Sequence, residues 1–147
     1  MKIRYTKIPD LLNPGGYNWY PLIQVCARSQ NKSRVFHALV DSGAVDCIFP
    51  KSIGTLMGID VLSGKPKTYF GLARQSAAGY LHEIDLQVTG YNHWIRIEVG
   101  FVDSDIIPLL GQTGFFSNYQ VIFERFRYQL EVNKRERALM RGRMHGH

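Results

Sequence analysis

The sequence predicts one mostly β domain with one or two short helices, and three observations support this. The chain has 147 residues, 45% hydrophobic and 12% aromatic, which is enough for a single domain with a substantial core. Its apolar residues fall into short runs separated by turn residues, as in strands. No internal repeat divides the chain, so one compact unit accounts for the residues up to about 132.

The first half contains three short apolar runs. Turn residues at 13–16 precede a predicted strand over 20–27. The next run, 35–40, is apolar on both faces, so we expect that strand to be buried on both sides. After a third run at 47–49, Pro50 can occupy the first turn of a short helix that ends at Gly58. Its apolar face would consist of Ile53, Leu56 and Met57.

The second half predicts a hairpin and three further strands. Strands over 68–70 and 80–89 flank a stretch rich in glycine and alanine, 71–79, which favours a mobile hairpin or, equally well, an ordinary exposed loop. Residues 93–102 alternate between apolar and charged, the pattern of a half-exposed strand. Beyond them we expect a short helix over 113–117 and two strands, 120–124 and 127–132, joined by a tight turn.

The net charge of +6 is concentrated at the C-terminus. Residues 134–147 hold five Lys or Arg and one acid, so the rest of the chain is nearly neutral. A basic, flexible tail over 133–147 follows, and a nucleic-acid partner is not expected, because the body lacks a basic face with interleaved aromatic residues. No apolar run is long enough to cross a bilayer and no signal core begins the chain, so we expect a cytoplasmic protein without a membrane partner.

No metal or other cofactor is expected. The five histidines and two cysteines form no Cys-x-x-Cys and no paired histidine spacing. Cys26 and Cys47 lie in apolar stretches, where a reduced, buried thiol is the common outcome. His37 is expected in the core or at its rim, and Ser42 lacks the Gly-x-Ser-x-Gly context of a serine nucleophile.

The triplet Asp41-Ser42-Gly43 directly follows the 35–40 strand. One interpretation is a stable turn, because Asp and Ser accept backbone N–H bonds and Gly permits positive φ. The other is a functional carboxylate, because an acid at the end of a buried strand is not what stability requires.

Further motifs favour the second interpretation. The sequence Asp-Ser-Gly-Ala at 41–44, followed by the apolar run 47–50, resembles the active-site loop of aspartic proteases. The run 109–111, which ends at Gly111 seventy residues after Asp41, resembles the second signature of that family. Residues 111–132 resemble the closing helix and hairpin of its single-domain, retropepsin-like members. The resemblance implies a closed or partly closed β-barrel over 20–132, preceded by an extension at 1–19 that is a candidate part of a dimer interface.

The resemblance also implies the chemistry. Since the chain has only one such acidic loop, the second carboxylate would come from another copy, and a two-fold axis would bring two Asp41 side chains together. The resulting homodimer would be an aspartic endopeptidase that hydrolyses peptide or protein substrates without a metal or a covalent intermediate. Ser42 would bond across the axis and Gly43 would let the substrate backbone approach closely.

The residues after Gly43 and those at the hairpin would contact substrate. By position, the segment around 69–80 corresponds to the flap of the family, which closes over bound peptide. The lack of a hydroxyl at the residue after Gly43 predicts a less acidic pH optimum. The candidate substrate-binding residues are Ala44, Asp46, Phe70, Gly71, Leu72 and Ala73.

Two departures from the retroviral pattern concern the dimer brace. Retroviral members pair an acid four positions after the catalytic Asp with an Arg after the second-motif glycine, and here those positions hold Val45 and Gln112. An alternative function therefore remains open, a catalytically silent retropepsin-like module for dimerisation or peptide binding.

Overall fold

The computed structural model describes residues 1–135, so most of the predicted basic tail lies outside the described residues. The described chain is mostly strand, with one α-helix and three short 3₁₀ turns. The elements are β1 (Lys2–Arg4), β2 (Thr6–Pro9), β3 (Tyr17–Tyr20), β4 (Leu22–Ser29), β5 (Lys32–Val40), β6 (Cys47–Pro50), α1 (Lys51–Leu56), η1 (Val61–Ser63), β7 (Lys65–Phe70), η2 (Leu72–Arg74), β8 (Ser76–Val88), β9 (Ile95–Val102), β10 (Leu109–Leu110), β11 (Tyr119–Glu124), η3 (Arg125–Arg127) and β12 (Gln129–Lys134).

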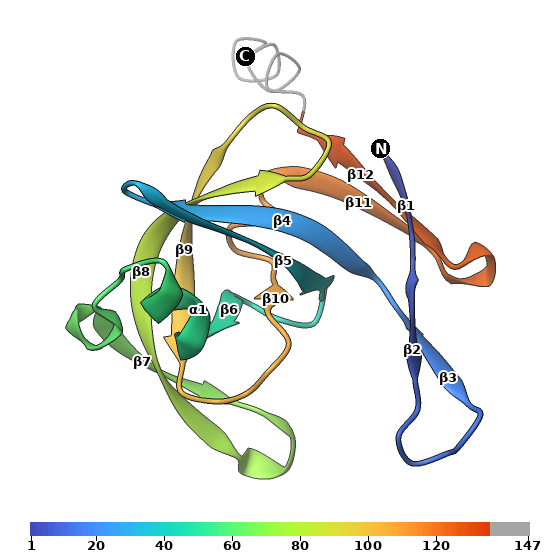
Figure 1. The fold of residues 1–147 in the computed structure, drawn as a ribbon, viewed down its shortest axis with the longest axis horizontal. Helices are drawn as coiled ribbons and strands as arrows, with labels where there is room; N and C mark the ends of the chain where they lie inside the picture. The colour runs from blue at the N-terminus through green and yellow to red at the C-terminus, as the bar shows by residue number, and fades with distance from the viewer. Residues whose placement is uncertain (136–147) are drawn as a thin grey trace, which may run out of the picture.

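Seven strands form one sheet in the order β4-β5-β10-β6-β9-β8-β7 (Figure 1). An additional antiparallel pairing of β4 with β8 brings distant parts of this sheet together, so that it curls into a partly closed barrel. The prediction of a mostly β fold with few helices is confirmed.

The barrel core comes from the inward-facing residues of alternating strands. In β9, Ile95, Ile97 and Val99 are buried while Arg96 and Glu98 face outward, as the alternation predicts. Burying an aliphatic or aromatic side chain of this size stabilises the fold by about 1.5–3 kcal/mol. The largest fully buried side chains include Phe49, Phe101, Phe115, Ile23, Met57, Ile84, Leu86, Leu110 and Leu130.

The short strand β10 positions the candidate site. It pairs in parallel with β5 and in antiparallel with β6, so it lies between the two strands that flank the loop over 41–46. In turn, β6 pairs in parallel with β9. The two motifs that the sequence singles out are therefore neighbours in the sheet.

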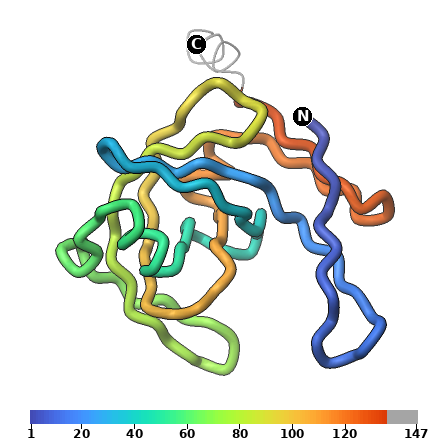
Figure 2. The backbone as a smooth tube through the Cα atoms, viewed as in Figure 1, coloured from blue at the N-terminus to red at the C-terminus, as the bar shows by residue number. Residues whose placement is uncertain are grey.

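The N-terminal 20 residues are folded rather than loosely attached. Strand β1 pairs with β12, and the Met1 amino group donates to the Val132 carbonyl at 3.0 Å. Figure 2 shows this N-terminal segment running beside the C-terminal hairpin β11–β12. Strands β2 and β3 then form a separate hairpin whose loop contains the predicted turn at 13–16. A role of this segment in a dimer interface stays a prediction.

The expectation that the 35–40 strand is buried on both sides is wrong for its first half. Val35 is 59% exposed and His37 is exposed, whereas Ala38 and Val40 are buried. The reason is the sheet topology: β5 pairs with β4 along its length but meets β10 only at its last two residues. His37 is therefore not a core residue.

The predicted helix over 113–117 is wrong. The segment is a series of turns, in which Gly114 adopts φ +100° and its N–H donates to the Ser117 hydroxyl at 3.0 Å. The Asn118 side-chain amide donates to the Gly114 carbonyl at 2.6 Å. These side-chain hydrogen bonds satisfy the backbone without a helix, because Ser and Asn compete for it locally.

Helix α1 forms where Pro50 predicts it, but its buried face differs. Leu56 is 55% exposed, while Met57 and Gly54 are buried. A Cβ on Gly54 would lie 2.9 Å from the Phe101 ring, so the glycine allows the helix to approach β9 closely. The hairpin after α1 also differs in detail, since residues 77–79 belong to strand β8 and the connection is shorter than 71–79.

Candidate active site

The Asp41 loop is held by its own backbone. The Asp41 N–H donates to the Leu110 carbonyl at 3.0 Å, which ties the end of β5 to β10. One carboxylate oxygen of Asp41, Oδ1, accepts the Gly43 N–H at 2.9 Å, and the Ala44 N–H donates to the Asp41 carbonyl at 3.2 Å. The triplet is thus a real turn, and it also holds the half-buried Asp41 carboxylate in a fixed orientation.

The second motif packs directly against this loop. The Gln112 N–H donates to the Ala44 carbonyl at 2.8 Å, and the Thr113 N–H donates to the Val45 carbonyl at 2.7 Å. Asp46 directly precedes β6. A Cβ on Gly111 would lie 2.3 Å from the Asp46 carbonyl oxygen. Only glycine permits this backbone approach, which explains why a glycine follows β10.

Gln112, at the position of the arginine in the retroviral ion pair, makes a neutral hydrogen bond instead. The Gln112 side-chain amide donates to the Ser42 carbonyl at 2.7 Å. Val45, at the position of the absent acid, is 70% exposed. The loop is therefore braced within the chain through Gln112, a contact that no sequence motif predicts.

Cys47 lies beneath the loop, fully buried. Its sulfur accepts the Gly111 N–H at 3.4 Å and lies 3.5 Å from the Thr113 carbonyl. Burial raises the pKa of the Cys47 thiol above its ordinary value, so the sulfur stays protonated and serves as a packing group. Both cysteines are free, and Cys26 is partly exposed.

Strands β7 and β8 form a hairpin over the segment that the resemblance predicts as a flap, and this hairpin is called the flap below. At its tip the Gly71 N–H donates to the Gln75 carbonyl at 2.8 Å, and Ala73 adopts φ +58°. Phe70 and Leu72 are 78% and 92% exposed. The flap therefore presents apolar side chains at its end.

A cleft of about 850 Å³ separates the Asp41 loop from the flap. Of the residues that the sequence predicts for the site, Ser42 and Ala73 do not line it. Those that do are Asp41, Gly43, Ala44, Asp46, Phe70, Gly71 and Leu72. The structure adds six residues that the sequence analysis missed: Val45, Ile48, Lys67, Thr68, Tyr69 and Leu109.

An ion pair joins the flap to the loop over 41–46. Lys67 on β7 binds the Asp46 carboxylate through its ammonium group. The Asp46 side chain is only 15% exposed, whereas that of Lys67 is 43% exposed. No sequence signal marks Lys67, because the contact depends on the flap folding back over a loop 21 residues earlier.

Tyr69 lies next to this ion pair, with the Lys67 ammonium 5.5 Å from its ring centroid. Its ring lies against Gly79 and Gly100, where an added Cβ would collide with the ring or the hydroxyl. Burial raises the pKa of Tyr69 above its ordinary value, and the nearby Asp46 carboxylate adds to the shift. The phenol therefore stays neutral and helps to fix the flap strand on the barrel.

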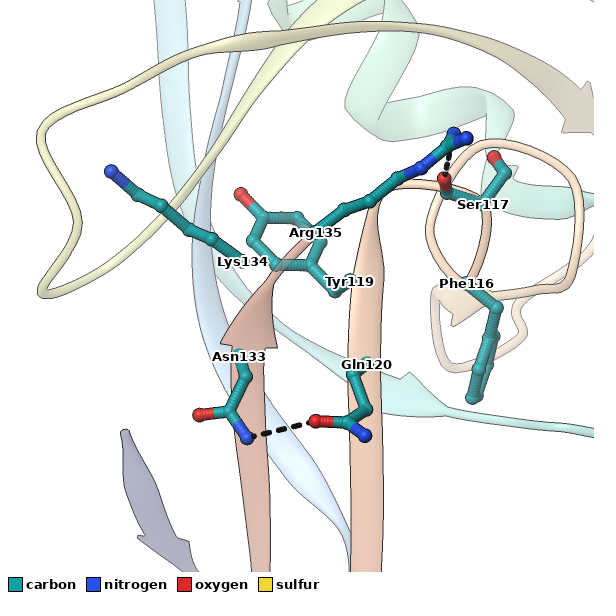
Figure 3. A pocket seen from close by; sticks show the side chains of 7 residues that line it. All are labelled: Phe116, Ser117, Tyr119, Gln120, Asn133, Lys134 and Arg135. Carbon is teal, nitrogen blue, oxygen red and sulfur yellow. Dashed lines mark hydrogen bonds between the residues drawn. The ribbon is translucent and has the colours of Figure 1, made fainter. Parts of the chain in front are cut away.

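Other hollows lie outside the cleft on the described part of the chain, and two of them are relevant to the site. One of about 370 Å³ borders Asp41 on another side and is lined by Tyr20, Pro21, Leu39, Val40, Asp41, Ser42 and Phe123. The other, of about 820 Å³, lies near the end of β12 and is lined by Phe116, Ser117, Tyr119, Gln120, Asn133, Lys134 and Arg135 (Figure 3). Its lining contains no carboxylate, whereas the cleft of similar volume contains Asp41 and Asp46.

Residues 1–135 contain neither a cluster of metal-ligating side chains nor a membrane-spanning helix. Nowhere in this part of the chain do three His, Cys, Asp or Glu side chains gather in a way that could hold a metal ion. Over the same residues, no helix has the length and apolar character needed to span a membrane.

Comparison with known proteins gives a structural match only. No protein-family model and no curated protein matches the sequence. Among solved structures, a retropepsin-like aspartic protease from Rickettsia conorii superposes with a TM-score of 0.58 at 18% identity, covering 88% of this chain and 97% of that one. The chain has a retropepsin-like fold. The EIAV protease complexed with the inhibitor HBY-793 matches with a TM-score of 0.46 at 14% identity, over 68% of this chain and 86% of that one.

Within this retropepsin-like fold, the Asp41 loop and the flap face each other across one cleft. The arrangement combines a carboxylate that accepts a backbone hydrogen bond from Gly43 with a cleft whose lining is mostly apolar. A single copy supplies one carboxylate of this kind.

Proposed function

We propose that this chain is an aspartic endopeptidase that works as a homodimer, with one Asp41 from each copy. The observation that carries the proposal is the position of Asp41, half-buried in a glycine loop at the cleft beneath the flap. The sequence has no second Asp-Ser-Gly or Asp-Thr-Gly, so two facing carboxylates require two copies. The retropepsin-like fold supports the same assignment.

The chemistry follows from two carboxylates within hydrogen-bonding distance. Such a pair shares one proton, because two adjacent negative charges are costly in a poorly solvated site. The ionised Asp41 takes a proton from a bound water as the water oxygen attacks the scissile carbonyl carbon, and the protonated Asp41 donates its proton to the carbonyl oxygen. The Asp41 that took the water proton then donates it to the leaving nitrogen, while the other Asp41 removes a hydroxyl proton from the tetrahedral intermediate. The C–N bond breaks, and the dyad again holds one shared proton.

The neighbouring residues have supporting roles in this proposal. Ser42 is exposed beside Asp41 and would bond across the two-fold axis. A Cβ on Gly43 would lie 3.3 Å from the Asp41 carboxylate, so glycine keeps the approach to that carboxylate open for substrate backbone. Ala44, Asp46, Phe70, Gly71 and Leu72 would contact the peptide along the cleft, and Ala73 would act at the flap tip. The proposed location is the cytoplasm, which the two free cysteines support.

The decisive experiment compares wild type with Asp41→Asn against a mixed peptide library from acidic to neutral pH. The variant keeps the shape of the side chain but cannot share the proton, so turnover should fall by about 100- to 10,000-fold. Asp103→Asn, at an exposed acid outside the cleft, is the matched control and should retain full activity. Turnover that survives in Asp41→Asn would refute the proposal, and a dimer that binds peptide without cleaving it would favour the silent module.

A further inference from the structure

The loop of the β2–β3 hairpin exposes two adjacent leucine side chains to solvent. Leu11 and Leu12 are 94% and 95% exposed. The loop is nevertheless ordered: the Asp10 carboxylate accepts the Leu12 N–H at 3.0 Å, and the Asp10 N–H donates to the Gly16 carbonyl at 2.9 Å. A folded turn that presents two large apolar side chains is a feature of interaction surfaces, in contrast to single exposed leucines.

The hairpin is fixed to the body at its base. The Lys7 ammonium lies 3.9 Å from the Tyr17 ring centroid, and the Trp19 ring lies 4.6 Å from the ring of Tyr128, next to η3. These contacts stiffen the hairpin and attach it to the C-terminal hairpin. The leucine pair is therefore held at a defined place relative to the barrel.

Asp41 lies between this hairpin and the flap. Tyr20 and Pro21, at the hairpin base, line the hollow of about 370 Å³ that also borders Asp41. The flap residues meet Asp41 in the separate cleft. In Figure 1 the β2–β3 hairpin and the β7–β8 hairpin extend toward the same side of the molecule, the lower side of the view.

The proposed dyad fixes how a second copy must sit, and this step rests on the proposed function. A substrate that touches both Asp41 carboxylates needs the two clefts to open onto each other, so both flaps must stand on the same side of the dyad. The two-fold axis then passes by Asp41 along the direction in which the flap extends. The second copy therefore lies across the axis from the first copy's flap, on the side where Tyr20 and Pro21 of the first copy border Asp41.

We propose that the β2–β3 hairpin is a dimerisation arm, whose Leu11–Leu12 tip packs against the flap tip of the second copy at Phe70 and Leu72. A two-fold rotation about that axis brings the partner's flap to the hairpin side, and the flap tip is apolar and exposed, as the arm requires. The hairpin of each copy then packs on the flap residues that line the other copy's cleft. Dimer formation and flap position become coupled, because the same contact serves both.

Cross-linking between copies tests the arm directly. Leu12→Cys in one copy is mixed with Leu72→Cys in a copy of different mass, both in a Cys26→Ser background, since Cys26 is the partly exposed thiol. Oxidation should yield a mixed disulfide dimer that retains the folded state. Leu62→Cys, at a leucine 59% exposed on η1, replaces Leu12→Cys as the control and should give at least tenfold less product. Equal yields would overturn the arm.

Sedimentation equilibrium gives a second measurement. Leu11→Ser with Leu12→Ser should raise the dimer dissociation constant at least tenfold, while Leu62→Ser should change it less than twofold. An unchanged dissociation constant in the double variant would overturn the arm. Both leucines are exposed, so the double variant should fold normally.

The outcomes separate the arm from the proposed function. A dimer with full activity but no Leu12–Leu72 cross-link refutes the arm and leaves the dyad standing. A strong cross-link together with peptidase activity in Asp41→Asn refutes the dyad and leaves the arm standing. A protein that is monomeric at every concentration refutes both.

Discussion

The side-chain amide of Gln112 donates a 2.7 Å hydrogen bond to the carbonyl of Ser42, so the residue after the second-motif glycine braces the loop that carries Asp41. In the retroviral pattern an ion pair occupies these positions, and here Val45 replaces its acid. A neutral contact within the chain therefore stabilises the loop without burying a charge.

The first prediction concerns this hydrogen bond. Gln112→Ala should lower kcat about fivefold, the equivalent of a hydrogen bond worth about 1 kcal/mol, because the Asp41 loop loses its brace. Stability should fall by about 1 kcal/mol or less, since Gln112 is exposed. Peptide hydrolysis and urea unfolding measure the two effects.

The control is Gln120→Ala. Gln120 also takes part in an exposed hydrogen bond, with Asn133 at 3.3 Å, but it does not line the Asp41 cleft. Equal kcat values for the two variants would contradict a bracing role for Gln112.

The second prediction concerns Gly111. A methyl group there would lie 2.3 Å from the Asp46 carbonyl oxygen and 2.7 Å from the Ala44 carbonyl oxygen. Both are backbone atoms, so relieving the clash requires the loop backbone to move. Gly111→Ala should therefore destabilise the protein by about 1–3 kcal/mol in urea unfolding. Gly71→Ala is the control, since its nearest atom would be 3.9 Å away and its φ is negative. Similar stabilities for the two variants would show that the loop can move aside.

The third prediction concerns the ion pair between Asp46 and Lys67. A double-mutant cycle with Asp46→Asn and Lys67→Met should give a coupling free energy of about 0.5–1 kcal/mol, because the Lys67 side chain is 43% exposed and water screens the pair. Both single variants should raise KM for peptides, since the base of the flap loses its tether.

Salt provides the check on this cycle. The coupling free energy should shrink in about 1 M salt, where the Debye length is about 3 Å. A coupling of zero at low salt would mean that the contact contributes nothing to the position of the flap.

The fourth prediction concerns stability at high pH. Burial raises the pKa of Tyr119 from 10.0 to about 12 in the folded chain. Between about pH 10 and 12, the Tyr119 hydroxyl therefore stays protonated in the folded chain but ionises in the unfolded chain. Its contribution to the free energy of unfolding is complete below about pH 10 and is lost as the pH rises from 10 toward 12. One such group contributes a slope of at most about 1.4 kcal/mol per pH unit.

Tyr119→Phe tests this by urea unfolding between pH 9 and 12. The variant should lose stability at pH 9, because the Tyr119 hydroxyl shares a 2.9 Å hydrogen bond with His93. It should also decline less steeply above pH 10 than wild type. Parallel curves for wild type and Tyr119→Phe would contradict the assignment.

Local patterns in the sequence predicted the fold class and the position of the acidic loop. Alternation in β9 shows directly which residues face the core, and the run 109–111 marks the strand that meets Asp41. These features are readable because each depends on residues a few positions apart, whose spacing follows the period of a strand.

The local patterns failed where neighbours decide the outcome. The apolar first half of β5 reads as a buried strand, yet Val35 is exposed because no second strand covers that end of the sheet. The segment 113–117 reads as a helix, yet side-chain hydrogen bonds from Asn118 and Ser117 hold it as turns.

By itself, the sequence determined a β-rich domain and one acidic glycine loop beside a second apolar motif. Only the tertiary structure decided which groups surround that acid: Lys67 against Asp46, Gln112 against Ser42, and an N-terminal hairpin next to Asp41. These contacts join residues 20 to 70 positions apart. Their geometry is set by strand pairing and barrel closure. The alternation of apolar and polar residues within one short segment does not specify which strands pair.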